Sequence, residues 1–350
     1  MPELPEIFNI YRKDIEEEMK SIISVSNLPL YDMLKYHMGW MNETGKPGDF
    51  NKGKFLRATL CILAFISTMN KMNEKSIKKN HLKVLPAAAA IELIHNFSLI
   101  HDDIQDNDIQ RRHRPTLWYL WGKPQAINAG TTMKVLANLA VFRLKKYNVS
   151  CEKQLQIFKI LNESCLEMLE GQYLDISYEN KPEISIEEYM QMIESKTVSL
   201  IKGAILIGAV LNLDEKGLSS FEDFANHLGI AFQIRDDILG IWGSQEKTGK
   251  PIGGDIRKKK KSLPIVYALN NSPLKIKKEL MRIYSFKKIS ETNSSKVIKL
   301  LDEVKAKEYC ENKCDYFYNL AISKINNLPL SKEYYKSYYE ICDFLLTRDF

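Results

Sequence analysis

The feature that most constrains the fold of this chain is the spacing of its apolar residues. In segments such as 85–104, 185–211 and 221–242 they recur at steps of three and four residues, the pattern of helices buried on at least one face. Alternating strand patterns with Asn-Gly or Asp-Gly turns are nearly absent. Gly and Pro residues fall between the helical segments, and no repeat or linker divides the chain. The sequence therefore predicts one all-α domain over residues 1–350, with ten or more helices and the most apolar of them at the centre.

Composition narrows the class of protein. The 350 residues are 45% apolar, enough for a large core, and the six cysteines show neither a paired framework nor a zinc spacing. The first residues lack the order of a signal peptide, and the longest apolar run, which begins at Gly203, is too short to span a bilayer. We expect a soluble, cytoplasmic protein with reduced thiols. The run Lys258–Lys261 is typical of a solvated turn, and a net charge of +6 is mild, so no nucleic-acid partner is predicted.

An acidic stretch, "DDIQDND", follows an apolar helical run. Residues four apart on a helix differ by about 40° around the axis and about 6 Å along it, so Asp102 and Asp106 can hold divalent ions between them. Asp103 is turned about 100° away around the helix axis. We therefore expect it to support the metal-binding residues rather than to bind the ions itself. Carboxylates without histidine or thiol partners favour magnesium, which keeps water and phosphate oxygens as its other ligands. A solvated helix end is the alternative for this stretch alone, but "RDDILG" repeats the pattern within a second apolar helix at Asp236 and Asp237.

Basic residues accompany these acids and the other apolar helices. Arginine forks and lysine point charges bind diphosphates alongside magnesium, and their occurrence in two sets suggests two anionic substrates. The residues concerned are Lys54, Arg57, Arg111, Arg112, Lys196, Lys250 and Lys260.

Together these motifs resemble the trans-isoprenyl diphosphate synthases, also called polyprenyl synthetases. "DDIQDNDIQRR" has the DDxxD-x4-RR form of that family's first aspartate-rich motif, and "GKFLR", "GQYLD", "ESKTVSLI", "FQIRDD" and "TGKPIGGDIRKKKKSLP" complete the resemblance over roughly residues 50–265. The resemblance implies an isoprenoid-synthase-type helical bundle around a central cavity. It also implies a homodimer and a Mg²⁺-dependent prenyltransferase that condenses isopentenyl diphosphate with an allylic diphosphate, with about three ions bound.

The resemblance also implies roles for individual residues. Asp102 and Asp106 match the acids that bind two magnesium ions on the allylic diphosphate, and Asp236, with Asp237 beside it, matches the acid that binds a third. The bases that grip the allylic diphosphate are matched by Arg111, Lys196 and Lys250, with Lys260 nearby. The isopentenyl diphosphate pocket is matched by Lys54, Arg57, His95 and Arg112, although His95 taken alone would be interpreted as a packed core histidine. The reaction centre and the acid after the second motif are matched by Thr197, Gln233 and Asp255.

Three positions depart from the family pattern. Gly240 stands where many members have a third aspartate, Phe55 replaces a common arginine, and Thr131 occupies a position where aspartate is common. The last two raise a question about substrate affinity rather than reaction type. A class I terpene cyclase is the first alternative, but it would not need the second basic set. A non-catalytic partner subunit is the second alternative, but such a protein should have lost acids from the first motif.

Product length depends on what closes the cavity below the acids. Ser98 lies one helical turn beneath Asp102, whereas Phe97 is about 100° round from Ser98, so geometry alone leaves open whether its ring blocks the chain. The resemblance favours synthases that stop at geranylgeranyl diphosphate, with farnesyl diphosphate as the alternative. The apolar helix at 85–100 is predicted, again by resemblance, to lie close to the partner subunit of the homodimer.

Overall fold

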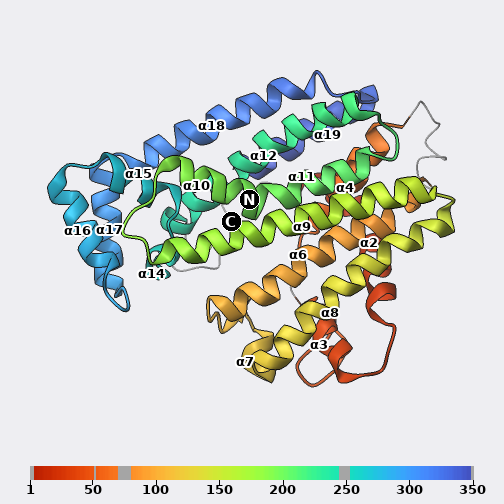
Figure 1. Ribbon diagram of the computed structural model, residues 1–350, viewed down its shortest axis with the longest axis horizontal. Coiled ribbons are helices and arrows are strands. Elements are labelled where there is room, and N and C mark those ends of the chain that lie inside the picture. The colour runs from red at the N-terminus through yellow and green to blue at the C-terminus, as the bar shows by residue number, and fades with distance from the viewer. Residues whose placement is uncertain (1–3, 51–52, 70–79, 244–252, 348–350) are drawn as a thin grey trace.

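The computed structural model describes residues 4–50, 53–69, 80–243 and 253–347, and nearly all its regular structure is helical (Figure 1). The first helices are α1 (Glu6–Ile10), α2 (Arg12–Ile23), α3 (Pro29–His37) and α4 (Leu56–Ser67). The central ones are α6 (Leu85–Gln105), α7 (Leu117–Trp121), α8 (Lys123–Val141), α9 (Cys151–Glu179), α10 (Ile186–Ile193), α11 (Ser199–Ala209) and α12 (Glu215–Trp242). The last are α14 (Gly254–Arg257), α15 (Leu263–Asn271), α16 (Leu274–Tyr284), α17 (Glu291–Glu303), α18 (Ala306–Ile325) and α19 (Tyr335–Thr347).

Short elements connect these helices. Three 3₁₀ turns span His81–Lys83, Phe142–Tyr147 and Lys332–Tyr334, and a π-helical segment, Glu194–Val198, joins α10 to α11. The strands of the described residues form a single hairpin, in which β1 (Gln110–Arg111) pairs antiparallel with β2 (Arg114–Pro115). The prediction of an all-α fold with more than ten helices is confirmed.

Two apolar helices occupy the centre of the bundle. α11 packs against α4, α6, α9 and α12, and every residue from Arg57 to Ser67 of α4 is buried. A helix surrounded on all sides must be apolar all round, and this agrees with the prediction made from the unbroken apolar runs. In Figure 1 the long helices α6, α8, α9, α12 and α18 run along the molecule, while α14 to α17 gather at one end. The acidic motifs lie in the C-terminal halves of α6 and α12.

The helix starts follow from local sequence chemistry. In α10, the Ser185 side chain accepts a hydrogen bond from the Glu188 N–H (3.1 Å), and the Glu188 side chain accepts one from the Ser185 N–H (2.8 Å), which forms a capping box. Asp214 caps α12 by accepting a hydrogen bond from the Gly217 N–H at 2.9 Å. These caps fix where α10 and α12 begin, and hence the rotation with which their later residues reach the centre of the bundle.

The surface of α8 and α9 differs from that of α6. Residues 85–94 of α6 are all buried within the chain, so this part of the helix offers no apolar surface to a partner, and the expectation that the helix at 85–100 lies close to one stays a prediction. Exposed apolar side chains instead form stripes on the neighbouring helices α8 and α9. They are Ile127, Val135 and Leu139 on α8, and Leu155, Leu166, Leu169, Tyr173 and Ile176 on α9.

Two further expectations concern compartment and thiol chemistry. In the described part of the chain, none of the helices combines the length and hydrophobicity that a membrane span needs. All six cysteines carry free thiols, and five of them are buried. The expectation of unpaired cysteines is confirmed.

Candidate active site

The C-terminal end of α6 presents the first acidic motif. The helix ends at Gln105, and the Asp106 N–H still donates to the Asp102 carbonyl at 2.8 Å, so the two acids lie one helical turn apart. Asp103 points away from them and is only 2% exposed. This is the orientation that the helical spacing predicts.

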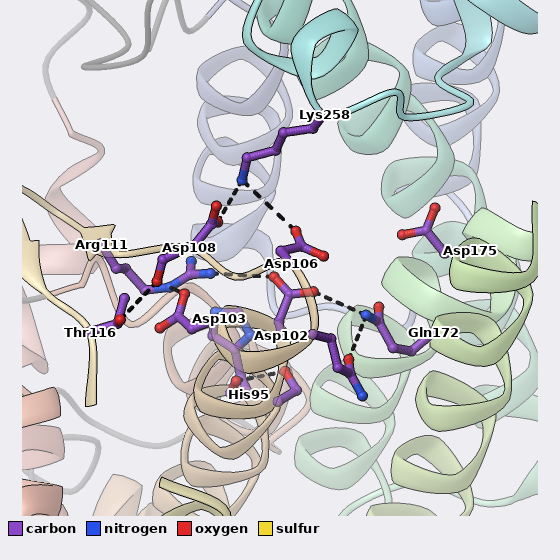
Figure 2. Close-up of polar contacts among 12 residues, drawn as sticks. His95, Asp102, Asp103, Asp106, Asp108, Arg111, Thr116, Gln172, Asp175 and Lys258 are labelled. Carbon is purple, nitrogen blue, oxygen red and sulfur yellow. Dashed lines mark hydrogen bonds and ion pairs between the residues drawn. The ribbon is translucent and has the colours of Figure 1, made fainter. Parts of the chain in front are cut away.

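Arg111 bridges the carboxylates of Asp102 and Asp103 at this end of α6 (Figure 2). Its Nε donates to Asp103 Oδ1 at 2.7 Å, and its Nη2 donates to Asp102 Oδ2 at 3.3 Å. Burial raises the pKa of Asp103 to about 6, against the opposing effect of Arg111. Asp103 therefore contacts the arginine rather than the cavity, in agreement with a supporting role.

A strained hairpin positions the next arginine. Arg111 pairs with Arg114, so Arg112 and His113 form a two-residue turn, and both have positive φ, 53° and 61°. Non-glycine residues adopt this conformation at a cost, which is typical of functional sites. A Cβ added at Gly53 would lie 2.8 Å from Arg112 Nη2, so the guanidinium rests closely against the backbone before α4.

Arg112, Arg57 and His95 form a buried basic pocket. The pKa of His95 is well below its usual value because the ring is buried and Arg57 and Arg112 lie near it, so the imidazole is neutral. The Arg57 Nε is buried and makes no hydrogen bond. Glu92 supplies some compensating charge near Arg57, although burial raises the pKa of its carboxyl. Buried donors of this kind suit an anionic ligand.

The π-helical segment presents Lys196 and Thr197 to the acids. Lys196 Nζ forms an ion pair with Asp175 of α9 and lies 3.9 Å from Asp102 Oδ1. Gly171 of α9 makes this possible, because a Cβ there would lie 2.1 Å from the Lys196 backbone nitrogen. A π-helical segment inside a helix frequently marks a functional site.

The same face of α9 also reaches the first motif. Gln172 Nε2 donates to Asp102 Oδ1 at 3.2 Å and to Gln105 Oε1 at 2.9 Å (Figure 2). The sequence analysis assigned no role to Gln172 or Asp175, although both belong to the "GQYLD" motif.

On the opposite side, α12 presents the second motif. Asp236 is exposed and faces the cavities, whereas Asp237 is 5% exposed and accepts three hydrogen bonds. Burial raises the pKa of Asp237 to about 7, while the hydrogen bonds from Leu263, Tyr189 and Gln233 oppose that rise. The two adjacent acids therefore have different surroundings.

Gly240 is explained by Asp255. A Cβ at Gly240 would lie 1.9 Å from Asp255 Oδ2, so a third aspartate in the second motif could not fit unless the Asp255 carboxylate moved. Both residues line the same cavity. The carboxylate of Asp255 thus reaches the cavity wall beside the position that the missing aspartate would occupy.

The other two departures lie away from the cavity walls. Phe55 is 2% exposed, has a φ of 53°, and packs beneath the guanidinium of Arg12, 5.0 Å from its ring centroid. Arg12 also donates to the Gly53 carbonyl at 3.1 Å, so α2 supplies a cation to this loop. Thr131 lies on the exposed surface of α8.

The lysine run after α14 begins as a turn at Lys258 and Lys259, and its side chains also face the first motif. Lys258 Nζ lies 2.5 Å from Asp108 Oδ2 and 3.9 Å from Asp106 Oδ2, and Lys260 lies 3.7 Å from Asp106 (Figure 2 shows Lys258). Burial alone would lower the pKa of Lys260, but Asp255, Asp106 and Asp102 raise it above its usual value. The interpretation as a solvated turn therefore holds for Lys258 only in part, because its exposed side chain pairs with Asp108, and it is wrong for Lys260 and Lys261, which are partly or fully buried.

Two cavities meet between these elements. One, of about 330 Å³, is lined among others by Asp175, Asp237, Asp255 and Lys260. The other, of about 360 Å³, is lined among others by Arg57, His95, Phe97, Ser98, Arg111 and Arg112. Both are lined by Asp102, Lys196, Thr197, Gln233 and Asp236. The structure therefore brings most of the predicted site residues to one place.

Two of the predicted residues are placed differently. The Lys54 ammonium lies 5.2 Å from the Phe344 ring centroid and is not among the residues that line either cavity. Asp106 also lies outside the lining, behind Lys258 and Lys260. Lys250 lies outside the described residues.

Comparison with known proteins now identifies the family. The family model described as Polyprenyl synthetase matches residues 40–302. The chain belongs to the polyprenyl synthetase family. A short chain isoprenyl diphosphate synthase of Methanocaldococcus jannaschii is 36% identical over 84% of this chain and 82% of its own length. A geranylgeranyl diphosphate synthase of Mycobacterium tuberculosis is 35% identical over 74% of this chain and 71% of its own.

The fold agrees with this assignment. A crystal structure of a polyprenyl synthetase from Streptomyces coelicolor has a TM-score of 0.88, is 30% identical, and covers 99% of this chain and 100% of its own. The family resemblance drawn from the motifs is confirmed, and with it the expectation of an isoprenyl diphosphate synthase, a trans-prenyltransferase.

The contact between Gly171 and the π-helical segment generates a first prediction. Gly171→Ala should displace Lys196 and Thr197, lower kcat/KM by about 100-fold and destabilise the fold by about 1–3 kcal/mol. Gly208→Ala is the matched control, because its Cβ would lie 2.0 Å from the Cys61 carbonyl, in a packed contact between α11 and α4. We expect it to lower the melting temperature while keeping the activity of the folded protein. Equal activity in both variants would contradict the positioning role of Gly171.

Proposed function

We propose that this protein is a Mg²⁺-dependent synthase that condenses isopentenyl diphosphate with an allylic diphosphate to form geranylgeranyl diphosphate. The observation that carries the proposal is the meeting of two cavities at Thr197 and Gln233. One has acids and Lys260 in its walls, which suits an allylic diphosphate with its metal ions. The other contains Arg57, Arg112 and neutral His95, which suits a second diphosphate.

The two alternatives are less well supported. A terpene cyclase ionises one allylic diphosphate and does not need the second buried basic pocket. A non-catalytic subunit does not need the paired acids, yet Asp102 and Asp236 both line the junction of the cavities. Incubation of the purified chain with Mg²⁺, isopentenyl diphosphate and an allylic diphosphate, followed by mass spectrometry, separates the three. We expect a linear prenyl diphosphate, whereas a cyclic hydrocarbon or no product would overturn the proposal.

The donor set fits magnesium. In the described part of the chain, no three His, Cys, Asp or Glu side chains are close enough to hold one metal ion. Magnesium sites usually take only one or two protein carboxylates and complete their shell with water and phosphate oxygens, so an open set of acids suits this ion. We assign Asp102, Asp106 and Asp236 to about three ions. When bound, Mg²⁺ would neutralise the charge that develops on the departing diphosphate.

The side chains then have separable tasks. Arg111, Lys196 and Lys260 hold the allylic diphosphate and stabilise it as a leaving group, so that the allylic C–O bond can ionise. Arg57, Arg112 and His95 hold isopentenyl diphosphate, with Lys54 as a more distant cation. The double bond of isopentenyl diphosphate attacks the allylic carbocation, a C–C bond forms, and a proton leaves to the departed diphosphate. The apolar helices around the junction keep water away from the cation.

The chain-length assignment rests on the floor of the second cavity. Phe97 and Ser98 both line it, and the Phe97 ring packs edge-on against His101 with centroids 4.9 Å apart. A Cβ at Gly130 of α8 would lie 2.5 Å from the His101 ring, so α8 holds that ring in place. Phe97 thus has a rigid neighbour behind it, which favours its role as a stop at geranylgeranyl diphosphate. Farnesyl diphosphate is the alternative product.

The exposed stripes on α8 and α9 favour a homodimer. Leu139 is 57% exposed and Leu166 57%, and each belongs to a row of apolar residues at helical spacing. Contiguous exposed apolar surface of this kind marks a protein–protein interface. A second copy of the chain, with its own two stripes, would cover both.

Removal of the first acid should abolish turnover. We expect Asp102→Ala to lower kcat by more than roughly 10³-fold, because an anion-binding site without its metal-binding acid cannot stabilise the leaving group. Excess chelator should have the same effect on the unmodified protein. Asp32→Asn on α3, which is exposed and paired with Lys35, is the control and should keep full activity. Normal activity in chelator would refute the metal requirement.

Changes in the cavity floor should alter product length. Phe97→Ala should add at least one isoprene unit, and Ser98→Phe should remove one, as read by mass spectrometry of the dephosphorylated products. Phe65→Ala is the control for lost packing, because Phe65 is buried in α4 and lines neither cavity. It should cost about 3–5 kcal/mol of stability with no change in product. If Phe97→Ala leaves the length unchanged, the assignment of the floor is wrong.

The dimer prediction can be tested by light scattering after gel filtration. We expect twice the chain mass of 40.5 kDa for the unmodified protein, and Leu166→Glu should reduce it to a single chain because a carboxylate would be buried unpaired. Leu274→Glu, on the exposed surface of α16, should leave the mass unchanged. A monomer at micromolar concentration would contradict the proposal.

A further inference from the structure

A chain of hydrogen bonds leads from the buried acid of the second motif to the junction of the cavities. Asp237 Oδ2 accepts from the Tyr189 hydroxyl and from the Leu263 N–H, each at 2.7 Å. Its Oδ1 accepts from Gln233 Nε2 at 2.8 Å. Gln233 Oε1 in turn accepts from the Thr197 hydroxyl at 2.6 Å. Four elements, α10, α12, the start of α15 and the π-helical segment, are joined in this way.

The chain has a fixed direction. A carboxylate only accepts hydrogen bonds, so the amide NH₂ of Gln233 must face Asp237 and its carbonyl must face Thr197. The Thr197 hydroxyl hydrogen is then committed to Gln233, and the remaining lone pairs of the Thr197 oxygen are left for the cavity. Thr197 and Gln233 line both cavities. The direction of the hydrogen bonds therefore decides whether the Thr197 hydroxyl presents its partly negative oxygen or its partly positive hydrogen to the junction.

We propose that Asp237 is a positioning residue that orients Gln233 and Thr197 so that oxygen lone pairs, and not a hydroxyl hydrogen, face the reacting allylic carbon. This inference rests on the proposed function, since it concerns the carbocation formed there. A lone pair stabilises developing positive charge, whereas an O–H aimed at the same point would destabilise it. Asp237 reaches the wall of the first cavity, but both of its oxygens accept hydrogen bonds from protein donors, so in this assignment it holds neither substrate nor metal, unlike Asp236.

Asp237→Asn tests the direction without a change of shape. Two protein donors face Oδ2, so the introduced amide would place its carbonyl there and turn its NH₂ toward Gln233. Gln233 would then reverse its amide and donate to Thr197, whose hydroxyl hydrogen would become free to point into the cavity. We expect the single-turnover rate, measured at pH 8.5, to fall by about 100-fold, while the KM of each diphosphate changes by less than about threefold.

A charge-preserving double variant should reverse this effect. In Asp237→Asn with Gln233→Glu, the carboxylate of residue 233 accepts from both residue 237 and Thr197. The Thr197 hydroxyl therefore regains its original direction at the same net charge, although the bond between residues 233 and 237 is reversed. We expect it to recover at least about tenfold of the lost rate. An Asp237→Asn variant as fast as the unmodified protein, or a double variant as slow as the single one, would overturn the proposal.

Asp214→Asn is the matched control for a lost charge on the same helix. Asparagine caps a helix about as well as aspartate, and Asp214 is exposed at the first turn of α12, so rate and melting temperature should be unchanged. A fall in rate equal to that of Asp237→Asn would attribute the effect to net charge and overturn the proposal.

A binding measurement separates this inference from the proposed function. An ammonium analogue of the allylic diphosphate carries positive charge where the carbocation forms, and a thiolodiphosphate analogue of the same length is neutral there. By calorimetry, Asp237→Asn should weaken the ammonium analogue by at least about tenfold and leave the neutral one unchanged. Equal weakening of both, or of neither, would overturn the inference. If the unmodified chain makes no prenyl diphosphate, the proposed function fails, and this comparison still decides whether the hydrogen-bond chain recognises a cation.

Discussion

The structure depends on how acids are kept ionised inside a bundle of apolar helices. Carboxylates in a partly buried place repel one another and lose hydration, so each needs a cation or a hydrogen-bond donor nearby. Here Arg111 holds Asp102 and Asp103, Lys196 reaches Asp102 and Asp175, and Lys258 and Lys260 face Asp106. These cations come from three separate segments: the β1–β2 hairpin, the π-helical segment and the turn after α14. Folding must therefore bring those segments together before any substrate binds.

Close backbone contacts set the precision of this arrangement. Gly171 allows α9 to touch the Lys196 backbone, Gly240 admits the Asp255 carboxylate, and Gly53 receives the Arg112 guanidinium. At each place a methyl group would require a shift of main chain or of a charged group. Because electrostatic interactions in a site of low dielectric change steeply with distance, these three glycines have consequences for binding as well as for packing.

Much of the fold and of the candidate site could be predicted from the sequence. The predictions that differ from the structure fail because the spacing and composition of a segment do not show which other segments it contacts. Apolar spacing indicates which residues are buried, so the helical class and the central position of the apolar segment that contains α11 could be predicted from it, whereas the central position of α4 was not predicted. It does not say what buries a helix: residues 85–94 of the helix predicted to lie close to a partner are covered by their own chain. The lysine run was misread because local composition cannot show that Asp106 and Asp108 lie opposite. The turn at Arg112 and the π-helical segment depend on tertiary contacts, and no local pattern indicated either.

The two Asp-Asp pairs show why adjacent identical residues need a structure to be told apart. Neighbours on a helix are turned by about 100°, so one side chain can face a cavity while the next is buried in protein. Asp102 and Asp236 line both cavities. Asp103 lines neither of them and binds Arg111, and Asp237, which reaches only the wall of the first cavity, has its oxygens engaged by Tyr189, Leu263 and Gln233. In both motifs the second acid orients a group that faces the cavity. A substitution at the second acid of either motif should therefore change the orientation of the side chain that this acid holds. A substitution at the first acid should instead reduce the number of ligands available to a metal cation.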